Sequence, residues 1–180
     1  MMPGLRALAL LSLAGALAAC GAPAGERDAA PAATARAGAS DAAPAGAADA
    51  AVLARAPLVT VYKSPTCGCC TKWEDHMRAH GFRVESHAVP DVTPTKVEKG
   101  LPPPLASCHT AVVDGYVLEG HVPAEDVKRL LQERPAVVGL AVPGMPMGSP
   151  GMEGLYSEEY EVLTFGRDGA TTVWARHGQR

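Results

Sequence analysis

The feature that most constrains this chain is SPTCGCC, residues 64–70, which places three cysteines within four positions directly after a short apolar run. Cys67 and Cys70 have the spacing of a redox C-x-x-C pair and lie on one turn of a helix. Cys69 adds a third thiol, which would scramble a pair used only for disulfide exchange. Neighbouring thiolates repel one another unless a cation holds them, so the cluster predicts a metal site.

A fourth cysteine, Cys108, precedes a predicted strand further along the chain. We expect its loop to pack against the start of the helix that carries Cys67, which would bring four thiols together. Soft sulfur ligands select Cu(I), with Zn(II) as a competitor. Zinc is the weaker candidate because only one of the two segments has the paired spacing of a structural zinc site.

Residues 57–180 carry the patterns of a folded domain. The β-branched and aromatic run Leu58–Tyr62 predicts a buried strand, and a helical pattern from about Cys67 to His80 ends at Gly81. Alternation of apolar and polar residues over Phe82–His87 predicts a second strand. A strand–helix–strand unit of this kind implies that the two strands are parallel.

The following segments continue the alternation of strands and helices. Thr93–Lys99 predicts a short helix with proline in its first turn, and Thr110–Asp114 and Tyr116–Glu119 predict two strands joined at Asp114-Gly115. A further helix is expected to open at Pro123. The order β-α-β-α-β-β-α is that of a thioredoxin-like α/β domain.

Residues 139–154 are expected to form a Gly/Pro/Met loop, followed by a C-terminal β-hairpin over residues 160–175. Thioether sulfur is a ligand for Cu(I), so Met145 and Met147 in this loop are candidate copper ligands. The alternative is that these methionines only fill gaps against the core.

Histidines supply further candidates. His121, between the last predicted strand and the helix that follows, is expected to border the thiols, with a surface or capping role as the alternative. His109 adjoins Cys108, but alternation along an extended chain predicts that it points away. His76 and His80 share a helix face, which we expect to be solvated because no acidic partner completes a metal site.

The N-terminus predicts export. Residues 1–19 have a single charge and an apolar run typical of a secretory signal peptide. Leu17-Ala-Ala-Cys20 resembles the lipobox of bacterial lipoproteins, so Cys20 is predicted to be lipidated; the alternative is ordinary cleavage near Ala19. Residues 20–56 are rich in Ala, Gly and Pro and predict a disordered tether.

These features place the domain in the periplasm, held to a membrane by lipid. Gly21 stands where an aspartate would favour inner-membrane retention, so the outer membrane is the expected location. The periplasm is oxidising, which permits disulfides. The formal net charge of −3 gives no electrostatic basis for binding nucleic acid.

Three stretches together resemble a known family: VYKSPTCGCCTKWEDHM, LASCHTAVVDGYVLEGHVPAEDVKRLL and GLAVPGMPMGSPGME. They look like the small periplasmic copper-resistance proteins typified by CopG, a family of metal-binding domains. The resemblance covers about residues 57–154. It implies a thioredoxin-like fold whose clustered cysteines bind Cu(I), with a multinuclear cluster as one form of the bound metal. Cys67, Cys69, Cys70 and Cys108 match the family's thiol positions.

The sequence thus favours a copper-binding envelope protein over an enzyme. It would sequester or relay Cu(I), exchanging metal with periplasmic donor or acceptor proteins, and a change in the metal's oxidation state is left open. The alternative is a thiol–disulfide oxidoreductase with Cys67 as nucleophile and Cys70 as resolving thiol.

Overall fold

The computed structural model describes residues 55–178. The predicted signal peptide, the predicted lipidation site Cys20 and all but the last two residues of the predicted tether therefore lie outside the described residues. Within residues 55–178, none of the helices has the length and apolar character that crossing a bilayer requires.

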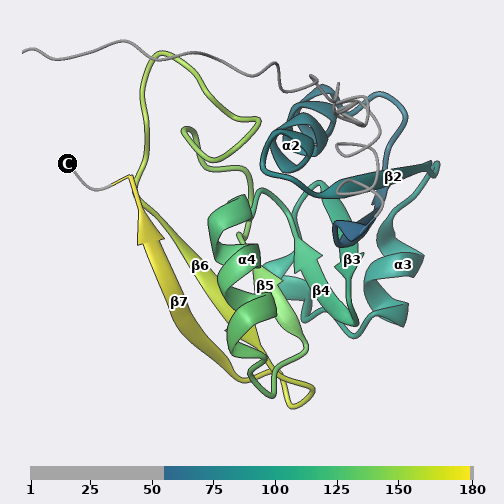
Figure 1. Cartoon of the computed structure of the whole chain (residues 1–180), viewed down its shortest axis with the longest axis vertical. Coiled ribbons are helices and arrows are strands. Elements are labelled where there is room, and N and C mark those ends of the chain that lie inside the picture. The colour runs from purple at the N-terminus through teal and green to yellow at the C-terminus, as the bar shows by residue number, and fades with distance from the viewer. Residues whose placement is uncertain (1–54, 179–180) are drawn as a thin grey trace, which may run out of the picture. The chain divides into compact units, whose positions relative to one another are not determined.

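The strands form a mixed sheet in the order β2-β1-β3-β4-β5-β6-β7 (Figure 1). Two neighbouring pairs, β1 with β2 and β4 with β5, are parallel, and the other four are antiparallel. The bounds are Leu58–Lys63 (β1), Arg83–Ala88 (β2), His109–Val113 (β3), Tyr116–Glu119 (β4), Gly139–Ala141 (β5), Tyr160–Phe165 (β6) and Thr171–His177 (β7). The parallel pairing of the first two strands and the C-terminal hairpin are as predicted.

The helical elements that accompany these strands in the described part of the chain are α2 (Gly68–Ala79), α3 (Thr93–Glu98), η1 (Pro103–Leu105, a 3-10 turn) and α4 (Ala124–Glu133). Up to α4 the strands and α-helices follow the predicted order. The main difference is β5, which occupies the first residues of the segment predicted to be a loop. Gly139 makes this strand possible, because a β-carbon there would overlap the backbone of Val117 on β4.

Apolar side chains form a core on each face of the sheet. On one face, α2 and α4 pack against the strands through Trp73, Met77, Val127 and Leu130; Figure 1 shows α4 lying across β4 to β6. The other face has a smaller core made of Leu101, Leu105, Val117, Ala141 and Phe165. Alternation along each strand separates the two sets, since successive side chains point to opposite faces.

Helix α2 begins directly after the turn that follows β1, with Cys67 as its N-cap residue and no side-chain hydrogen bond capping it. The first-turn N–H groups and the positive end of the helix dipole are therefore directed at the cysteine cluster. Further along, the Trp73 indole donates a hydrogen bond of 2.8 Å to the Val122 carbonyl oxygen. This bond fixes α2 against the segment that joins β4 to α4.

Candidate metal centre

Four cysteine sulfurs meet at one end of the sheet. The Sγ atoms of Cys67, Cys69, Cys70 and Cys108 all lie within 4.8 Å of one another. The first three come from the start of α2, and Cys108 comes from the loop immediately before β3. Strands β1 and β3 are antiparallel neighbours, with Lys63 opposite His109, so the end of one strand and the start of the other lie side by side. The structure brings the two predicted segments together.

Two of these sulfurs are oxidised in this structure. Cys67 and Cys70 form a disulfide, with their Cα atoms 5.4 Å apart, while Cys69 and Cys108 are free thiols. The Cys69 sulfur lies 3.5 Å from that of Cys67. Since a metal binds thiolates, all four sulfurs could act as ligands only after the disulfide has been reduced by two electrons and two protons.

His121 borders the cluster, as predicted. Its Nε2 atom lies 3.0 Å from the Cys108 sulfur, and its Nδ1 atom lies 2.7 Å from the Pro150 carbonyl oxygen. A carbonyl oxygen only accepts, so Nδ1 carries the proton and the Nε2 lone pair faces the sulfur. Burial, the main cause, lowers the pKa of His121 and favours this neutral form.

His109 also faces the cluster, so the expectation that it points away from Cys108 is wrong. Its Nδ1 atom lies 3.3 Å from the Cys108 sulfur, and its ring packs against Trp73 with centroids 4.4 Å apart. Cys108 precedes the strand, so the alternation that holds within a strand does not apply between the two residues. Cys108, His109 and His121 form a second group of potential ligands that shares one sulfur with the first.

Burial determines the protonation of this second group. Burial raises the pKa of the Cys108 thiol to about 11, and the nearby Cys69 adds to the effect. Burial also holds the pKa of His109 well below its usual value. Without metal, Cys108 is a neutral thiol beside neutral imidazoles, so a metal that binds its sulfur must displace a proton.

Two methionines of the loop after β5 lie beside Cys69 of the cluster. Met147 and Met152 line a cavity of about 340 Å³ together with Cys69 and four other residues: Gly68, Lys72, Gly151 and Glu153. Met145, the other predicted methionine, is about half exposed and does not line this cavity. Met152 was not among the candidates named from the sequence, because the path of this Gly- and Pro-rich loop depends on how it packs against α2.

The pair His76 and His80 has a structural role that the sequence did not indicate. His76 is half buried, and its Nε2 atom accepts a hydrogen bond of 3.1 Å from the backbone N–H of Ala124, the first residue of α4. The expectation of a solvated face is therefore wrong for His76. Neither histidine belongs to the ligand groups around the cysteines.

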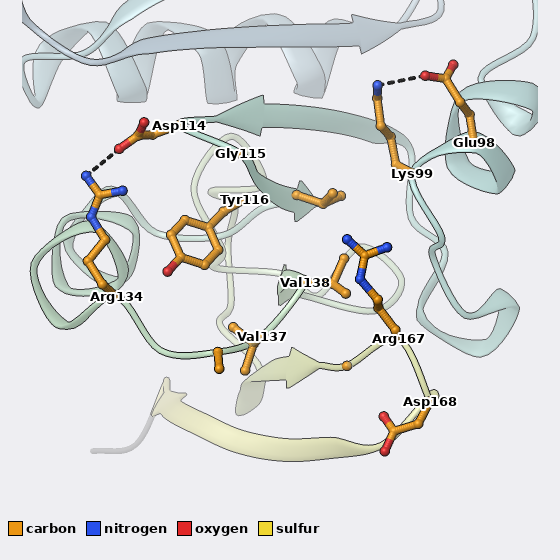
Figure 2. A pocket seen from close by; sticks show the side chains of 13 residues that line it. Glu98, Lys99, Asp114, Gly115, Tyr116, Arg134, Val137, Val138, Arg167 and Asp168 are labelled. Carbon is orange, nitrogen blue, oxygen red and sulfur yellow. Dashed lines mark hydrogen bonds and ion pairs between the residues drawn. The ribbon is translucent and has the colours of Figure 1, made fainter.

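A larger cavity, of about 790 Å³, lies at the opposite end of β3 (Figure 2). Ion pairs form parts of its wall, between Arg134 and Asp114 and between Lys99 and Glu98. Its lining contains no cysteine, histidine or methionine. Cavity size alone would therefore misplace the candidate site, which is defined by its soft ligands.

Fold and site together define a mixed α/β domain with a cysteine- and histidine-rich site of the kind that holds soft metal ions. A protein-family model described as "Protein of unknown function, DUF411" matches residues 105–152. Among solved structures, "Copper resistance protein copG- Form 2" is 44% identical, covers 68% of this chain and 98% of its own, and has a TM-score of 0.65. "Copper resistance protein copG- Form 1" has the same identity and coverage and a TM-score of 0.64.

No curated protein matches the chain. The identity of 44% to both solved structures is far above the level at which only a shared fold can be inferred, and the match extends over almost their whole length. The chain belongs to the CopG family of copper-resistance proteins.

Proposed function

We propose that the protein binds Cu(I) in copper resistance, with Cys67, Cys69, Cys70 and Cys108 as its sulfur ligands. The observation that carries this proposal is the mutual approach of the four sulfurs to within 4.8 Å, from two separate segments. Thiolate sulfur prefers soft ions, and Cu(I) above the others available to a protein of this kind. The names of the similar solved structures support copper rather than zinc.

The site's own residues would act in a defined order. Reduction of the Cys67–Cys70 disulfide by an external dithiol, which supplies two electrons and two protons, frees two thiols, and copper then displaces the thiol protons as it binds. The neutral His121 offers its Nε2 lone pair beside Cys108, and Met147 offers a thioether in the cavity that Cys69 also lines. Because Cys108 belongs to two groups of potential ligands, its sulfur could act together with either group when copper is bound.

The finer expectations are part of this proposal. The order of elements through α4 supports a thioredoxin-like domain. A periplasmic location, with a lipid on Cys20 holding the protein to the outer membrane, rests on the N-terminal sequence alone. Labelled fatty acid should be incorporated into the native chain and not into Cys20→Ser, and equal labelling of both chains would contradict the anchor.

Copper titration of the reduced chain under anaerobic conditions tests the proposal. Absorption from thiolate-to-copper charge transfer should rise and saturate above one copper per chain. Cys20→Ser is the matched control, because it replaces a cysteine that is not one of the four proposed ligands and should leave the titration unchanged. Absence of the band, or a titration that Cys108→Ser does not alter, would contradict the proposal.

A second function, thiol–disulfide exchange, is favoured by the disulfide between Cys67 and Cys70. Cys69→Ser separates the two functions, because exchange needs only the C-x-x-C pair, whereas the metal site loses a ligand. Under the copper proposal this variant loses most of its copper affinity and keeps the disulfide. Two results together would establish exchange instead: the native chain binds no copper, and Cys69→Ser reduces a disulfide substrate at the native rate.

A further inference from the structure

Glu119 is a fully buried carboxylate at the end of β4, two residues before His121. Its Oε1 atom accepts from Lys96 Nζ at 2.5 Å and from the backbone N–H of Ser107 at 2.6 Å. Its Oε2 atom accepts from the Thr110 hydroxyl at 2.7 Å. Lys96 Nζ also donates to the Thr110 hydroxyl at 3.1 Å, so the four groups form one closed network.

This network brackets Cys108. Ser107 is the residue before the cysteine and Thr110 lies two residues after it, and both are held by the same carboxylate. The Ser107 hydroxyl also donates to the Gly144 carbonyl oxygen. A β-carbon at Gly120, next to Glu119, would lie 2.6 Å from the Ser107 side chain, so glycine permits the close approach of these two segments.

The short helix α3 contributes only its lysine to this arrangement. It has no buried residue, yet Lys96 reaches from it to β3 and β4, and its side chain is only 13% exposed. A buried ion pair is weak as a source of stability, since apolar residues of similar volume often do as well. A charged pair with several hydrogen bonds can instead fix the positions of the polar groups that it binds, which apolar residues cannot do.

We propose that Lys96 and Glu119 are positioning residues that hold the Cys108 thiol at the place where it meets the sulfurs of α2. This inference rests on the proposed function, because it assigns the pair a role in copper capture. The pair contacts no cysteine sulfur. It holds the Ser107 backbone N–H on one side of Cys108 and the Thr110 hydroxyl on the other. The group that orients a ligand commonly sets the affinity for the metal.

Glu119→Gln is the main test, because it keeps the shape of the side chain and removes its charge. Cu(I) affinity, measured by competition with a chromophoric chelator, should fall by about 10- to 100-fold, and the charge-transfer band should shift. Asp126→Asn is the matched control: Asp126 is also a buried acid, and its partners are Arg129 and His177, outside the sulfur cluster. The control should keep native affinity and spectrum even if it unfolds more easily.

A second assay needs no copper. In the full chain with Cys20, Cys67 and Cys70 changed to serine, diamide takes two electrons and two protons from the remaining thiols as a Cys69–Cys108 disulfide forms. The rate reports how well Cys108 faces Cys69. Adding Glu119→Gln should slow this step several-fold, whereas adding Asp126→Asn should not.

The outcomes separate cleanly. A folded Glu119→Gln chain with native copper affinity, spectrum and disulfide rate would overturn the proposal. If that variant does not fold, Thr110→Val, which removes one arm of the network at nearly constant volume, decides in the same assays: losses support the proposal, and native behaviour overturns it. If the native chain binds no Cu(I), the proposed function fails, and the disulfide rate alone decides the positioning role.

Discussion

The Nε2 atom of His121 lies 3.0 Å from the sulfur of Cys108. The proton on the opposite ring nitrogen is held by the Pro150 carbonyl oxygen, 2.7 Å away. The loop after β5 therefore sets the tautomer of a histidine that follows β4, and through it the lone pair that faces the sulfur. The site depends on three separate segments, of which only one carries the conspicuous cysteine motif.

Replacing His121 should weaken copper binding without removing a sulfur. His121→Phe keeps the bulk of the ring and loses both nitrogens, so Cu(I) affinity should fall by at least the roughly tenfold that loss of a ligand-orienting group costs. Chelator competition measures the change. His80→Phe is the control, since His80 is the C-cap residue of α2 and lies outside the ligand groups; equal losses in both variants would contradict a role for His121.

The redox state of Cys67 and Cys70 should control loading. The oxidised chain offers two free thiols at the site and the reduced chain offers four. We therefore expect the reduced chain to retain more copper after desalting, as measured by elemental analysis per chain. Equal copper retention before and after reduction would show that the disulfide sulfurs are not ligands.

Gly151 should be required for the close packing of the loop after β5, which carries Met147 and Met152, against α2. Gly151 and Gly144 both have positive φ, 85° and 70°, so alanine at either position costs about 1–3 kcal/mol of backbone strain. Only at Gly151 would the new β-carbon also lie 2.6 Å from the Cys69 carbonyl oxygen. Urea unfolding should show a larger loss for Gly151→Ala than for Gly144→Ala, and similar losses would contradict close packing here.

Acid should destabilise the domain through His76. Burial, the largest cause, lowers the pKa of His76 from 6.5, and a protonated ring cannot accept the bond from the Ala124 N–H. The charged groups around this ring are His80, Glu125, Lys128 and Glu153.

A lowered folded-state pKa means that the unfolded chain binds the proton more readily, so this stabilisation is present above pH 6.5 and is lost as pH falls. Urea unfolding at pH 7.5 and 5.5 measures the loss. His76→Gln, whose amide oxygen can accept the same bond at both pH values, should lose less stability between them. An unchanged pH dependence in this variant would assign the effect to other groups.

Much of the fold could be predicted because its signals are local. Alternation, helical periodicity and the Asp114-Gly115 turn identified the strands and helices through α4, and the cysteine spacing identified the start of α2. Strand β5 was missed because three residues carry no periodicity, and Gly139 has no side chain to reveal its place between β4 and β6. Its pairing is tertiary, fixed by neighbours distant in sequence.

The candidate site shows the same division. Three cysteines are visible as a motif, and Cys108 could be placed because the loop before its strand was expected to pack against the start of the helix that carries Cys67. The orientation of His109 was missed because it depends on where the strand begins. The Lys96–Glu119 network was missed because nothing in the sequence marks an ordinary lysine and glutamate as buried partners.

Copper K-edge X-ray absorption on the reduced chain loaded with Cu(I) tests most directly whether the cysteine sulfurs coordinate the metal. We predict a Cu(I) edge with sulfur as the dominant neighbour, and a loss of sulfur neighbours in Cys108→Ser. A spectrum with only nitrogen and oxygen neighbours, or one that Cys108→Ser leaves unchanged, would contradict the account.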